Sequence, residues 1–321
     1  MIVLTGGAGF IGSCLLRRLN DEGIQDIFVV DSSLTPEKER NLAGKHFQGF
    51  EEKGKFLEII EKDALDKKID AVFHLGACTS TILMDVEYFK ENNLRYSQKI
   101  AGYAFKKGAR FIYASSAATY GDGSLGFKDN IETAFKLRPL NPYAESKQAF
   151  DLWLIETDLI KKSVGLKYFN VFGPNEYHKK EMRSLIAKSF DAVLREKKMK
   201  LFKSHIPEYG DGQQKRDFMY VRDAVDITYF FFNNRDAFGL FNVGTGKART
   251  WNDLARALFM ALGISPSIEY IDMPAGLRDK YQNFTEADLT KLKEAGYRKG
   301  FYELEEAVKE YAGFLKEGAY L

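Results

Sequence analysis

The chain contains little cysteine, histidine or proline. Its 321 residues include only two cysteines, four histidines and seven prolines. Cys14 and Cys78 lack the CxxC spacing of a thiolate site, and the histidines do not cluster in the sequence. We therefore predict neither a disulfide framework nor a metal site, and so few cysteines suit a reducing compartment. His74 stands inside an apolar run, so we expect it to be a hydrogen-bonded core residue.

The sequence also lacks an excess of one charge and a long hydrophobic run. Lys and Arg number 47 against 45 Asp and Glu, a formal net charge of +2. This balance argues against a nucleic acid or a membrane surface as a partner. No window has the ~20 apolar residues of a membrane span. The N-terminal MIVLTGG lacks the basic region and cleavage site of a signal peptide. We predict a cytoplasmic protein with a substantial core.

What is present is an alternation of short strand-like and longer helix-like segments. Strands are predicted at residues 2–5, 27–31, 55–60, 70–77, 109–116 and 165–171, and helices at 11–22, 85–107 and 143–161. Strands of this apolar character that alternate with helices form βαβ units. The sequence therefore predicts an α/β fold with a Rossmann-like, doubly wound parallel sheet that is covered on both faces.

The regular alternation ends near residue 172. We expect a helix at 181–197, strands at 239–246 and 268–274, a helix that Thr250 caps, and a helical tail at 286–317. The predicted organisation is an NAD(P)-binding Rossmann domain over residues 1–172, which also receives part of 215–250, and a smaller α/β substrate lobe over residues 173–321.

The stretch TGGAGFIG, residues 5–12, places three glycines between a strand and a helix. Gly6 permits a tight turn, Gly9 lets the backbone approach a pyrophosphate, and Gly12 allows close packing between helix and sheet. The phosphates would lie at the helix N-terminus, where free N–H groups and the helix dipole favour anions. Asp31 ends the next strand roughly 20 residues later, as the dinucleotide-binding fingerprint requires. We therefore predict dinucleotide binding.

The sequence leaves the choice between NAD and NADP open. Asp31 would hydrogen-bond a ribose hydroxyl, which favours NAD. Lys38, Arg40 and Lys53 lie nearby in the sequence, and a cation could instead hold the 2′-phosphate of NADP. Each of these cations alone is more often a surface charge.

A serine, a tyrosine and a lysine follow in an order that suits hydride chemistry. In NPYAESK (141–147), Tyr143 and Lys147 stand at i and i+4 and share one face of a helix. A nearby ammonium and a positive nicotinamide ring would lower the pKa of the Tyr143 phenol from ~10 and let it act as a base. Ser116 ends the preceding strand and could hydrogen-bond a substrate hydroxyl. Thr119 is a second candidate, although a packing role is the commoner one.

Together, the glycine turn, the Ser-rich strand end and the Tyr–Lys pair resemble the short-chain dehydrogenase/reductase superfamily, in its extended branch that acts on nucleotide sugars. FNVFGP (169–174), KRDFMYVRD (215–223) and FNVGTG (241–246) match the same branch. HLGACTST (74–81) and YQNFTEADLTKLKEAGY (281–297) are similar to the epimerases of that branch that invert C6 of an ADP-linked heptose for the lipopolysaccharide core. The resemblance implies bound NADP, an ADP-heptose substrate and a homo-oligomer.

The resemblance also implies which residues form the site. Besides the glycine turn, the positions for the cofactor are Phe10, Ile11, Asp31, Ser32, Lys38, Lys53, Leu75, Gly76, Ala77, Cys78, Thr79, Asn92, Lys147, Val171 and Lys179. The positions for the substrate are Ser116, Asn170, Glu181, Lys188, Phe202, Ser204, Arg216 and Tyr281. The Arg216 guanidinium would hold the diphosphate of the sugar nucleotide. An ion pair with Asp217 or Asp223 is its alternative role.

The resemblance places a second base five residues after the proline of the Gly-Pro turn, which is Lys179 here. When a carbinol carbon is inverted by oxidation and re-reduction, its oxygen occupies two positions in turn, and each needs an acid/base group. Tyr143 would serve one position and Lys179 the other, whereas Lys180 is expected to be exposed. A diphosphate or cofactor contact, or a solvated charge, is the alternative for Lys179. The sequence departs from the pattern at Asn175, where the resemblance implies an arginine.

Two other functions stay open. A UDP-hexose 4-epimerase, or another enzyme of the extended branch, would share most of these motifs. A dehydratase fits less well, because SAATYGD (116–122) lacks a carboxylate beside the catalytic threonine. A non-catalytic NADP-sensing protein on the same fold is the alternative from another class. The presence of Ser116, Tyr143 and Lys147 argues against it.

Overall fold

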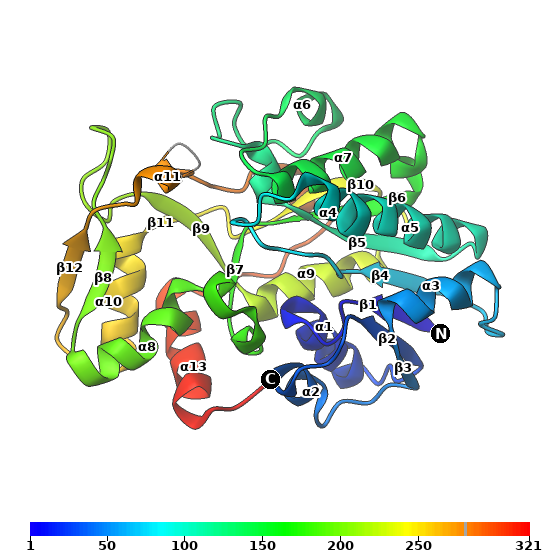
Figure 1. Cartoon of the computed structure of the whole chain (residues 1–321), viewed down its shortest axis with the longest axis horizontal. Coiled ribbons are helices and arrows are strands. Elements are labelled where there is room, and N and C mark those ends of the chain that lie inside the picture. The colour runs from blue at the N-terminus through cyan, green and yellow to red at the C-terminus, as the bar shows by residue number, and fades with distance from the viewer. Residues whose placement is uncertain (279–280) are drawn as a thin grey trace.

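A seven-stranded parallel sheet forms the centre of the protein (Figure 1), whose computed structural model describes residues 1–278 and 281–321. Its strands follow the order β10-β6-β5-β4-β1-β2-β3. They are β1 (Ile2–Thr5), β2 (Ile27–Asp31), β3 (Gly49–Glu52), β4 (Ala71–His74), β5 (Arg110–Ser116), β6 (Ser163–Tyr168) and β10 (Gly239–Val243). Every neighbouring pair runs parallel. The predicted Rossmann-like, doubly wound sheet is confirmed.

Helices cover both faces of this sheet. On one face lie α1 (Phe10–Asp21) and α9 (Val221–Asn233), which pack against each other. On the other lie α3 (Lys53–Glu61), α5 (Tyr96–Lys106) and α7 (Pro142–Glu156). Neighbouring residues of β1 show the division, since Val3 and Leu4 belong to different apolar clusters. The strands β1, β2, β4 and β5 likewise place apolar side chains on both faces, which explains their continuous hydrophobic runs.

Shorter helical segments complete this part of the chain. They are α2 (Pro36–Leu42), α4 (Val86–Phe89), the π-helical η1 (Lys90–Arg95), η2 (Ala117–Tyr120), α6 (Ile131–Lys136) and η3 (Leu159–Lys162).

The rest of the chain builds two small sheets, and most of their strands and helices lie at the left of Figure 1, whereas α12 (Thr290–Glu294) packs against β10 of the large sheet. One sheet has the order β11-β9-β7 and the other pairs β12 with β8. The strands are β7 (Asn170–Phe172), β8 (Met199–Phe202), β9 (Lys215–Tyr220), β11 (Ala248–Thr250) and β12 (Ile268–Ile271). The helices are η4 (Tyr177–Met182), α8 (Leu185–Glu196), α10 (Trp251–Ala261), α11 (Ala275–Arg278), α12 (Thr290–Glu294) and α13 (Leu304–Glu317). The predicted cap of α10 is confirmed as a complete capping box between Thr250 and Asp253.

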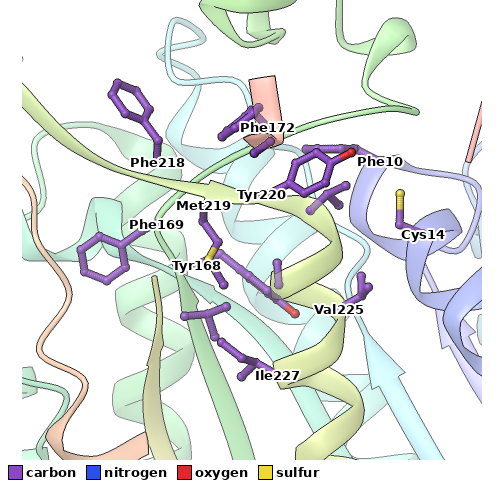
Figure 2. Close-up of a cluster of buried hydrophobic side chains, with 14 of the residues drawn as sticks. Phe10, Cys14, Tyr168, Phe169, Phe172, Phe218, Met219, Tyr220, Val225 and Ile227 are labelled. Carbon is purple, nitrogen blue, oxygen red and sulfur yellow. The ribbon is translucent and has the colours of Figure 1, made fainter. Parts of the chain in front are cut away.

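An apolar cluster joins the small sheets to the large one (Figure 2). Its side chains come from α1, β6, β7, β9, α9 and a residue between strands: Phe10, Cys14, Tyr168, Phe169, Phe172, Phe218, Met219, Tyr220, Val225 and Ile227. The rings of Phe172 and Tyr220 lie 5.6 Å apart on adjacent strands. The hydroxyl groups of Tyr168 and Thr228 share a hydrogen bond of 2.7 Å. Burial of these rings fixes β7 and β9 near the carboxyl end of the large sheet.

Several predicted elements are wrong or misplaced. Residues 55–60 form most of helix α3 rather than a strand, because Phe56 and Ile60, at i and i+4, are its buried residues. The edge strand is instead β3, which precedes α3. The predicted helix 85–107 contains a π-helical turn, helix 143–161 ends at Glu156, and the tail 286–317 divides into α12 and α13. The predicted strand 165–171 divides into β6 and β7.

His74 is a satisfied core residue, as predicted. It is 1% exposed, and its two ring nitrogens lie 2.7 Å from the hydroxyl oxygens of Thr5 and Ser97. Burial lowers the pKa of its imidazole to about 3. The neutral ring therefore holds β1, β4 and α5 together at the carboxyl end of the sheet.

No group of three or more His, Cys, Asp or Glu side chains in residues 1–278 and 281–321 is placed to hold a metal ion. No helix in this range has the length and apolar character to cross a membrane.

Candidate active site

One cavity of about 570 Å³ opens at the carboxyl ends of the central strands. Its walls come from the glycine turn after β1, Asp31 at the end of β2, residues 75–80 after β4 and Ser116 at the end of β5. Strand order reverses between β1 and β4, and open α/β sheets bind ligands at such a switch point. The volume falls in the range of roughly 300–1,000 Å³ typical of small-molecule sites.

All the residues predicted to contact the cofactor line this cavity, although they come from distant parts of the chain. They are Gly6, Gly9, Phe10, Ile11, Gly12, Asp31, Ser32, Lys38, Lys53, Leu75, Gly76, Ala77, Cys78, Thr79, Asn92, Lys147, Val171 and Lys179. The structure therefore brings the whole predicted set together at one place.

The glycine turn has the geometry that a dinucleotide needs. Gly6 has φ +71°, and a Cβ there would lie 2.5 Å from the backbone nitrogen of Gly76. Gly9 caps α1 without a side-chain hydrogen bond, so the first N–H groups of this helix stay available to an anion. A Cβ on Gly12 would lie 2.0 Å from the carbonyl oxygen of Gly6. Gly12 therefore permits close packing of the helix on the turn itself, rather than on the sheet as predicted.

Asp31 is already bonded to groups of the protein. One carboxylate oxygen accepts from the Ala8 amide at 2.9 Å. The other accepts from the Ser32 amide at 2.8 Å and from the Lys38 ammonium at 2.7 Å. Lys38 also donates to the Ser32 hydroxyl at 2.7 Å. The acid fixes the glycine turn and positions a cation at the cavity wall, whereas Arg40 is exposed and does not line the cavity.

A second cation lines the same cavity. The Lys53 ammonium donates to the Asn92 side-chain oxygen at 2.6 Å and lies 5.9 Å from the centre of the Tyr96 ring. Tyr88 and Tyr96 stand four residues before and after Asn92, and both line the cavity. Residues at i and i+4 share one face of a helix. The sequence could therefore have indicated that Tyr88 and Tyr96 lie beside Asn92, but our prediction missed both tyrosines.

Tyr143 lies in the first turn of α7. The Asn141 side chain accepts from the Ala144 amide at 3.0 Å, and Pro142 occupies the first helical position. An N-cap and a proline in this order fix where a helix begins. Tyr143 and Ser116 both line the cavity, and a hydrogen bond with Ser116 acts to lower the pKa of the Tyr143 phenol.

The pKa of Tyr143 differs from the prediction. Burial raises the pKa of the phenol above its usual value of 10, and the hydrogen bond with Ser116 offsets this only in part. The Lys147 ammonium donates to the carbonyl oxygen of Ala114 at 2.8 Å, and burial lowers its own pKa to about 8. The protein groups alone therefore leave Tyr143 protonated. The positive ring of a bound nicotinamide is the remaining source of the predicted lowering.

A buried ion pair is linked through Thr119 to the carboxyl end of β5. The Lys167 ammonium lies 2.7 Å from the Asp151 carboxylate, with side chains 1% and 0% exposed. Lys167 also donates to the Thr119 hydroxyl at 2.8 Å, which in turn donates to the Ser116 carbonyl oxygen at 2.7 Å. The Asp151 carboxylate accepts two further hydrogen bonds, from the hydroxyls of Tyr113 and Ser115. Thr119 therefore has a supporting role and does not line the cavity.

Lys179 lines the same cavity as Tyr143. It belongs to η4, and its ammonium lies 5.2 Å from the centre of the Phe10 ring. Burial lowers the pKa of Lys179, and Lys188 adds to this effect while Glu176 opposes it. A lysine with a lowered pKa can exchange a proton nearer to neutral pH. Lys180 is exposed, as predicted, and it does not line the cavity.

Other cavity-lining residues were not predicted. They are Thr5, Val30, Ser80, Tyr88, Tyr96, Ala114, Ser115, Tyr168, Phe169, His178 and Met182. The Nδ1 atom of His178 lies 3.4 Å from the Asn41 side-chain nitrogen. Burial lowers the pKa of His178 to about 4, and the nearby Lys38 and Lys179 contribute. His178 is therefore neutral at pH 7.

Only one predicted substrate residue, Ser116, lines the cavity. Asn170, Glu181, Lys188, Phe202, Ser204, Arg216 and Tyr281 do not line it. Glu181 and Lys188 are exposed, and the Lys188 ammonium lies 3.3 Å from the Glu181 carbonyl oxygen. The Ser204 hydroxyl donates to the Ile206 carbonyl oxygen at 2.8 Å, within its own turn. The structure does not bring these three residues to the cavity.

Arg216 and Tyr281 do come together. The Arg216 guanidinium lies 4.8 Å from the centre of the Tyr281 ring and 5.6 Å from that of Trp251. The side chain of Arg216 is 5% exposed and donates to the carbonyl oxygen of Lys215 at 2.9 Å. The rings of Tyr281 and His205 meet edge to face, with their centroids 6.0 Å apart. Two predicted substrate residues, from segments 65 positions apart in the sequence, therefore form one aromatic-lined cationic site.

The alternative role predicted for Arg216 is wrong. The Asp217 carboxylate accepts from the backbone amides of residues 245, 246 and 287 instead. Asp223 accepts from the amide of Tyr302. Within residues 1–278 and 281–321, no carboxylate lies within ion-pair distance of Arg216. A buried guanidinium of this kind is suited to an anionic ligand.

Comparison with known proteins places the chain in a family. The model of the NAD dependent epimerase/dehydratase family matches residues 2–244. The chain belongs to this NAD dependent epimerase/dehydratase family. The resemblance indicated by the sequence is thereby confirmed, and the family's description agrees with a nicotinamide dinucleotide as the cofactor.

Two members of the family that are named ADP-L-glycero-D-manno-heptose-6-epimerase are similar over nearly their whole length. The protein from Nitratidesulfovibrio vulgaris is 50% identical over 311 residues, which cover 97% of this chain and 96% of that protein. The protein from Fusobacterium nucleatum is 41% identical over 333 residues and is matched in full.

Solved structures of the family share the fold. The crystal structure of the Helicobacter pylori ADP-L-glycero-D-manno-heptose-6-epimerase has a TM-score of 0.81 at 27% identity and covers 98% of this chain and 96% of its own. The UDP-N-acetylglucosamine 4-epimerase from Methanobrevibacter ruminantium has a TM-score of 0.82 at 26% identity, with 99% and 98% covered. The fold alone therefore does not distinguish between the two sugar nucleotides.

Proposed function

We propose that this protein inverts C6 of ADP-D-glycero-β-D-manno-heptose to give the L-glycero epimer, and so supplies heptose for the lipopolysaccharide core. The observation that carries the proposal is that Tyr143 and Lys179 line one cavity with the dinucleotide-type glycine turn. Two acid/base groups beside one hydride carrier are what inversion through a ketone requires. The names of the relatives at 50% and 41% identity support the choice of sugar.

The reaction would proceed by transient oxidation to a 6-keto sugar. A nicotinamide dinucleotide held by the glycine turn and Lys147 would supply the hydride chemistry at C6. Tyr143, with Ser116 bonded to it, exchanges the proton of the C6 oxygen in one orientation of the sugar. After the ketone has turned its other face to the cofactor, the oxygen lies elsewhere, and Lys179 exchanges the proton there. Lys147 would hold the nicotinamide ribose.

The two ends of the substrate would bind in different places. Ser116 is at the cavity, where the carbinol carbon would react. Arg216 and Tyr281 offer a buried cation and an aromatic ring, which suit the diphosphate and the nucleotide base. Phe202 and Ser204 lie beside or within the stretch 203–214 that precedes Arg216. Their roles in binding the substrate stay predictions. Likewise, the homo-oligomer and the cytoplasmic location stay predictions from the resemblance and the composition.

A comparison of two sugar nucleotides tests the proposal. The purified protein is incubated with ADP-D-glycero-β-D-manno-heptose and separately with UDP-galactose, and the configuration at C6 or C4 is followed by NMR. Inversion of the ADP sugar alone is expected. Turnover of UDP-galactose without turnover of the ADP sugar would contradict the proposal and favour a UDP-hexose 4-epimerase. Binding of NADP with no turnover of either sugar would favour the sensing protein.

We further propose that the cofactor is NADP rather than NAD. Both carboxylate oxygens of Asp31 already accept protein hydrogen bonds, and the Lys38 ammonium is paired with it. This arrangement leaves Asp31 less available to ribose hydroxyls and presents a cation with the Ser32 hydroxyl, a pair suited to a phosphate. Lys53 supplies a second cation at the same cavity.

Replacement of Lys38 by Ala tests this choice. A charge-assisted hydrogen bond contributes about 1.5–3 kcal/mol, so affinity for NADP should fall by roughly 10–100-fold while affinity for NAD changes little. Cofactor extracted from the wild-type protein should be NADP(H), and titration of both dinucleotides into the variant gives the affinities. Arg40→Ala is the matched control, because Arg40 does not line the cavity. An equal loss for NAD and NADP would show that Lys38 only braces Asp31.

A further inference from the structure

The turn that carries Lys179 is held by the last residues of the described chain. We propose that Asn175 and residues 319–321 form a clamp that positions Lys179 for its proton transfer. This inference rests on the function proposed above, since it concerns the same lysine. It also accounts for the asparagine that stands where the resemblance implies an arginine.

Asn175 is the centre of the clamp. It is 0% exposed and has φ +74°, a left-handed conformation that asparagine adopts more readily than most residues. Its side-chain oxygen accepts from the Leu321 amide at 2.8 Å, and its nitrogen donates to the Leu321 carbonyl oxygen at 3.2 Å. The same nitrogen donates to the Ser13 hydroxyl at 2.9 Å. One buried side chain therefore binds both backbone groups of Leu321 and ties them to α1.

The two residues before Leu321 add further contacts. The Tyr177 hydroxyl donates to the Ala319 carbonyl oxygen at 2.8 Å. The rings of Tyr177 and Tyr320 meet edge to face with centroids 4.8 Å apart. The Lys45 ammonium donates to the Leu321 carbonyl oxygen from the segment after α2. Figure 1 shows the C-terminus beside α2, which agrees with these contacts.

The clamped turn leads directly to Lys179. The Lys179 amide donates to the Glu176 carbonyl oxygen at 3.0 Å, the first bond of η4. The carboxylate of Glu176 accepts from the amide and hydroxyl of Ser184, each at 2.6 Å, and from the Tyr311 hydroxyl at 2.9 Å. Tyr311 belongs to α13, so the C-terminal helix and the residues after it hold the turn on both sides.

Asn41 links this clamp to the cofactor end of the cavity. Its side-chain nitrogen donates to the carbonyl oxygens of Ala8, at 2.9 Å, and of Asn175, at 3.1 Å. Ala8 lies within the glycine turn. These hydrogen bonds therefore connect the turn that carries Lys179 to the place where the cofactor would bind. A misplacement of ~1 Å at a reacting group costs about 10²-fold in rate. A loosened clamp should therefore damage the step that uses Lys179 most.

Asn175→Gly is the sharpest test, because glycine keeps the left-handed backbone and removes only the side-chain bonds. Asn234→Gly is the matched control. Asn234 donates one side-chain hydrogen bond, to the Ala295 carbonyl oxygen at 2.7 Å, and does not line the cavity. Hydrogen exchange is measured at the amides of Lys179 and Ser184. Epimerisation of the ADP-heptose and the amount of reduced cofactor at steady state are measured on the same preparations.

In Asn175→Gly we expect faster exchange at both amides and a fall in epimerisation of about 10²-fold. The cofactor should stay bound. Starting from the epimer that Tyr143 oxidises, the reduced form of the cofactor should accumulate because the re-reduction step at Lys179 is slowed. Unchanged exchange, or a rate equal to that of Asn234→Gly, would overturn the clamp. If the wild-type protein fails to epimerise the ADP sugar while exchange still rises in Asn175→Gly, the proposed function falls and the clamp stands.

Discussion

Replacement of Lys179 by Met is expected to lower epimerisation by about 10²–10⁴-fold, the range contributed by a positioned acid/base group. Methionine keeps much of the length of the side chain, but it cannot carry a proton and loses the ammonium that faces Phe10. The cofactor should stay bound in stoichiometric amount. Lys180→Met is the matched control, because Lys180 is exposed and does not line the cavity. A Lys179→Met protein with near wild-type rate would remove the second base from the mechanism.

The pH dependence of the same step follows from the pKa of Lys179. Burial lowers this pKa below 10.5, the ordinary lysine value. At a given pH, a larger fraction of the molecules therefore carries Lys179 as the free amine than would carry an ordinary lysine in that form. Only the free amine accepts a hydroxyl proton. Starting from the epimer whose oxidation uses Lys179, the rate should therefore rise with pH and level off below 10.5. If the rate levels off only at pH 10.5, or if its rise with pH persists in Lys179→Met, the rise belongs to another group.

Replacement of Tyr143 by Phe is expected to lower epimerisation by a similar factor of about 10²–10⁴. Phenylalanine keeps the ring and its contact with Phe89 at 6.4 Å but removes the hydroxyl that is bonded to Ser116. Initial rates and the bound cofactor per chain give the effect. Tyr103→Phe is the control, since the Tyr103 hydroxyl is buried without a hydrogen-bond partner in the described part of the chain and does not line the cavity.

The two variants should fail in complementary ways. If Tyr143 and Lys179 serve opposite orientations of the sugar, each variant oxidises one epimer of the ADP-heptose and not the other. Reduced cofactor, followed by absorbance after mixing with each epimer, reports this half-reaction. Loss of oxidation of both epimers in Tyr143→Phe, with neither lost in Lys179→Met, would indicate a single base.

The residues at the cofactor end of the site could be predicted from the sequence because the backbone geometry that they need is local. A positive φ and a close backbone approach at Gly6 demand glycine, and no other residue type answers both. The apolar strands of the buried sheet could be predicted for a similar reason, because each is a continuous hydrophobic run. The run FLEII (56–60) was misread because a short apolar segment fits either a strand or a helix, and only the burial of Phe56 and Ile60 decides between them.

The substrate end and the clamp depend on contacts that sequence spacing does not contain. Asn175 and Leu321 are separated by 146 positions. The pKa of Tyr143 depends on how burial compares with its hydrogen bond, a balance that spacing cannot give. Arg216 is a further case. It precedes Asp217 directly on β9, where neighbouring side chains point to opposite faces, and no strand was predicted there, so only the structure excludes their ion pair.

The most direct test of inversion through a ketone is the NMR spectrum of the product formed in D₂O from ADP-D-glycero-β-D-manno-heptose. In the proposed reaction the hydrogen on C6 would leave and return as hydride without exchange with solvent, so the L-glycero product should carry no solvent deuterium at C6. Deuterium at C6 of the inverted product would show that the hydrogen exchanges as a proton. That result would contradict the roles assigned to the glycine turn, Tyr143 and Lys179.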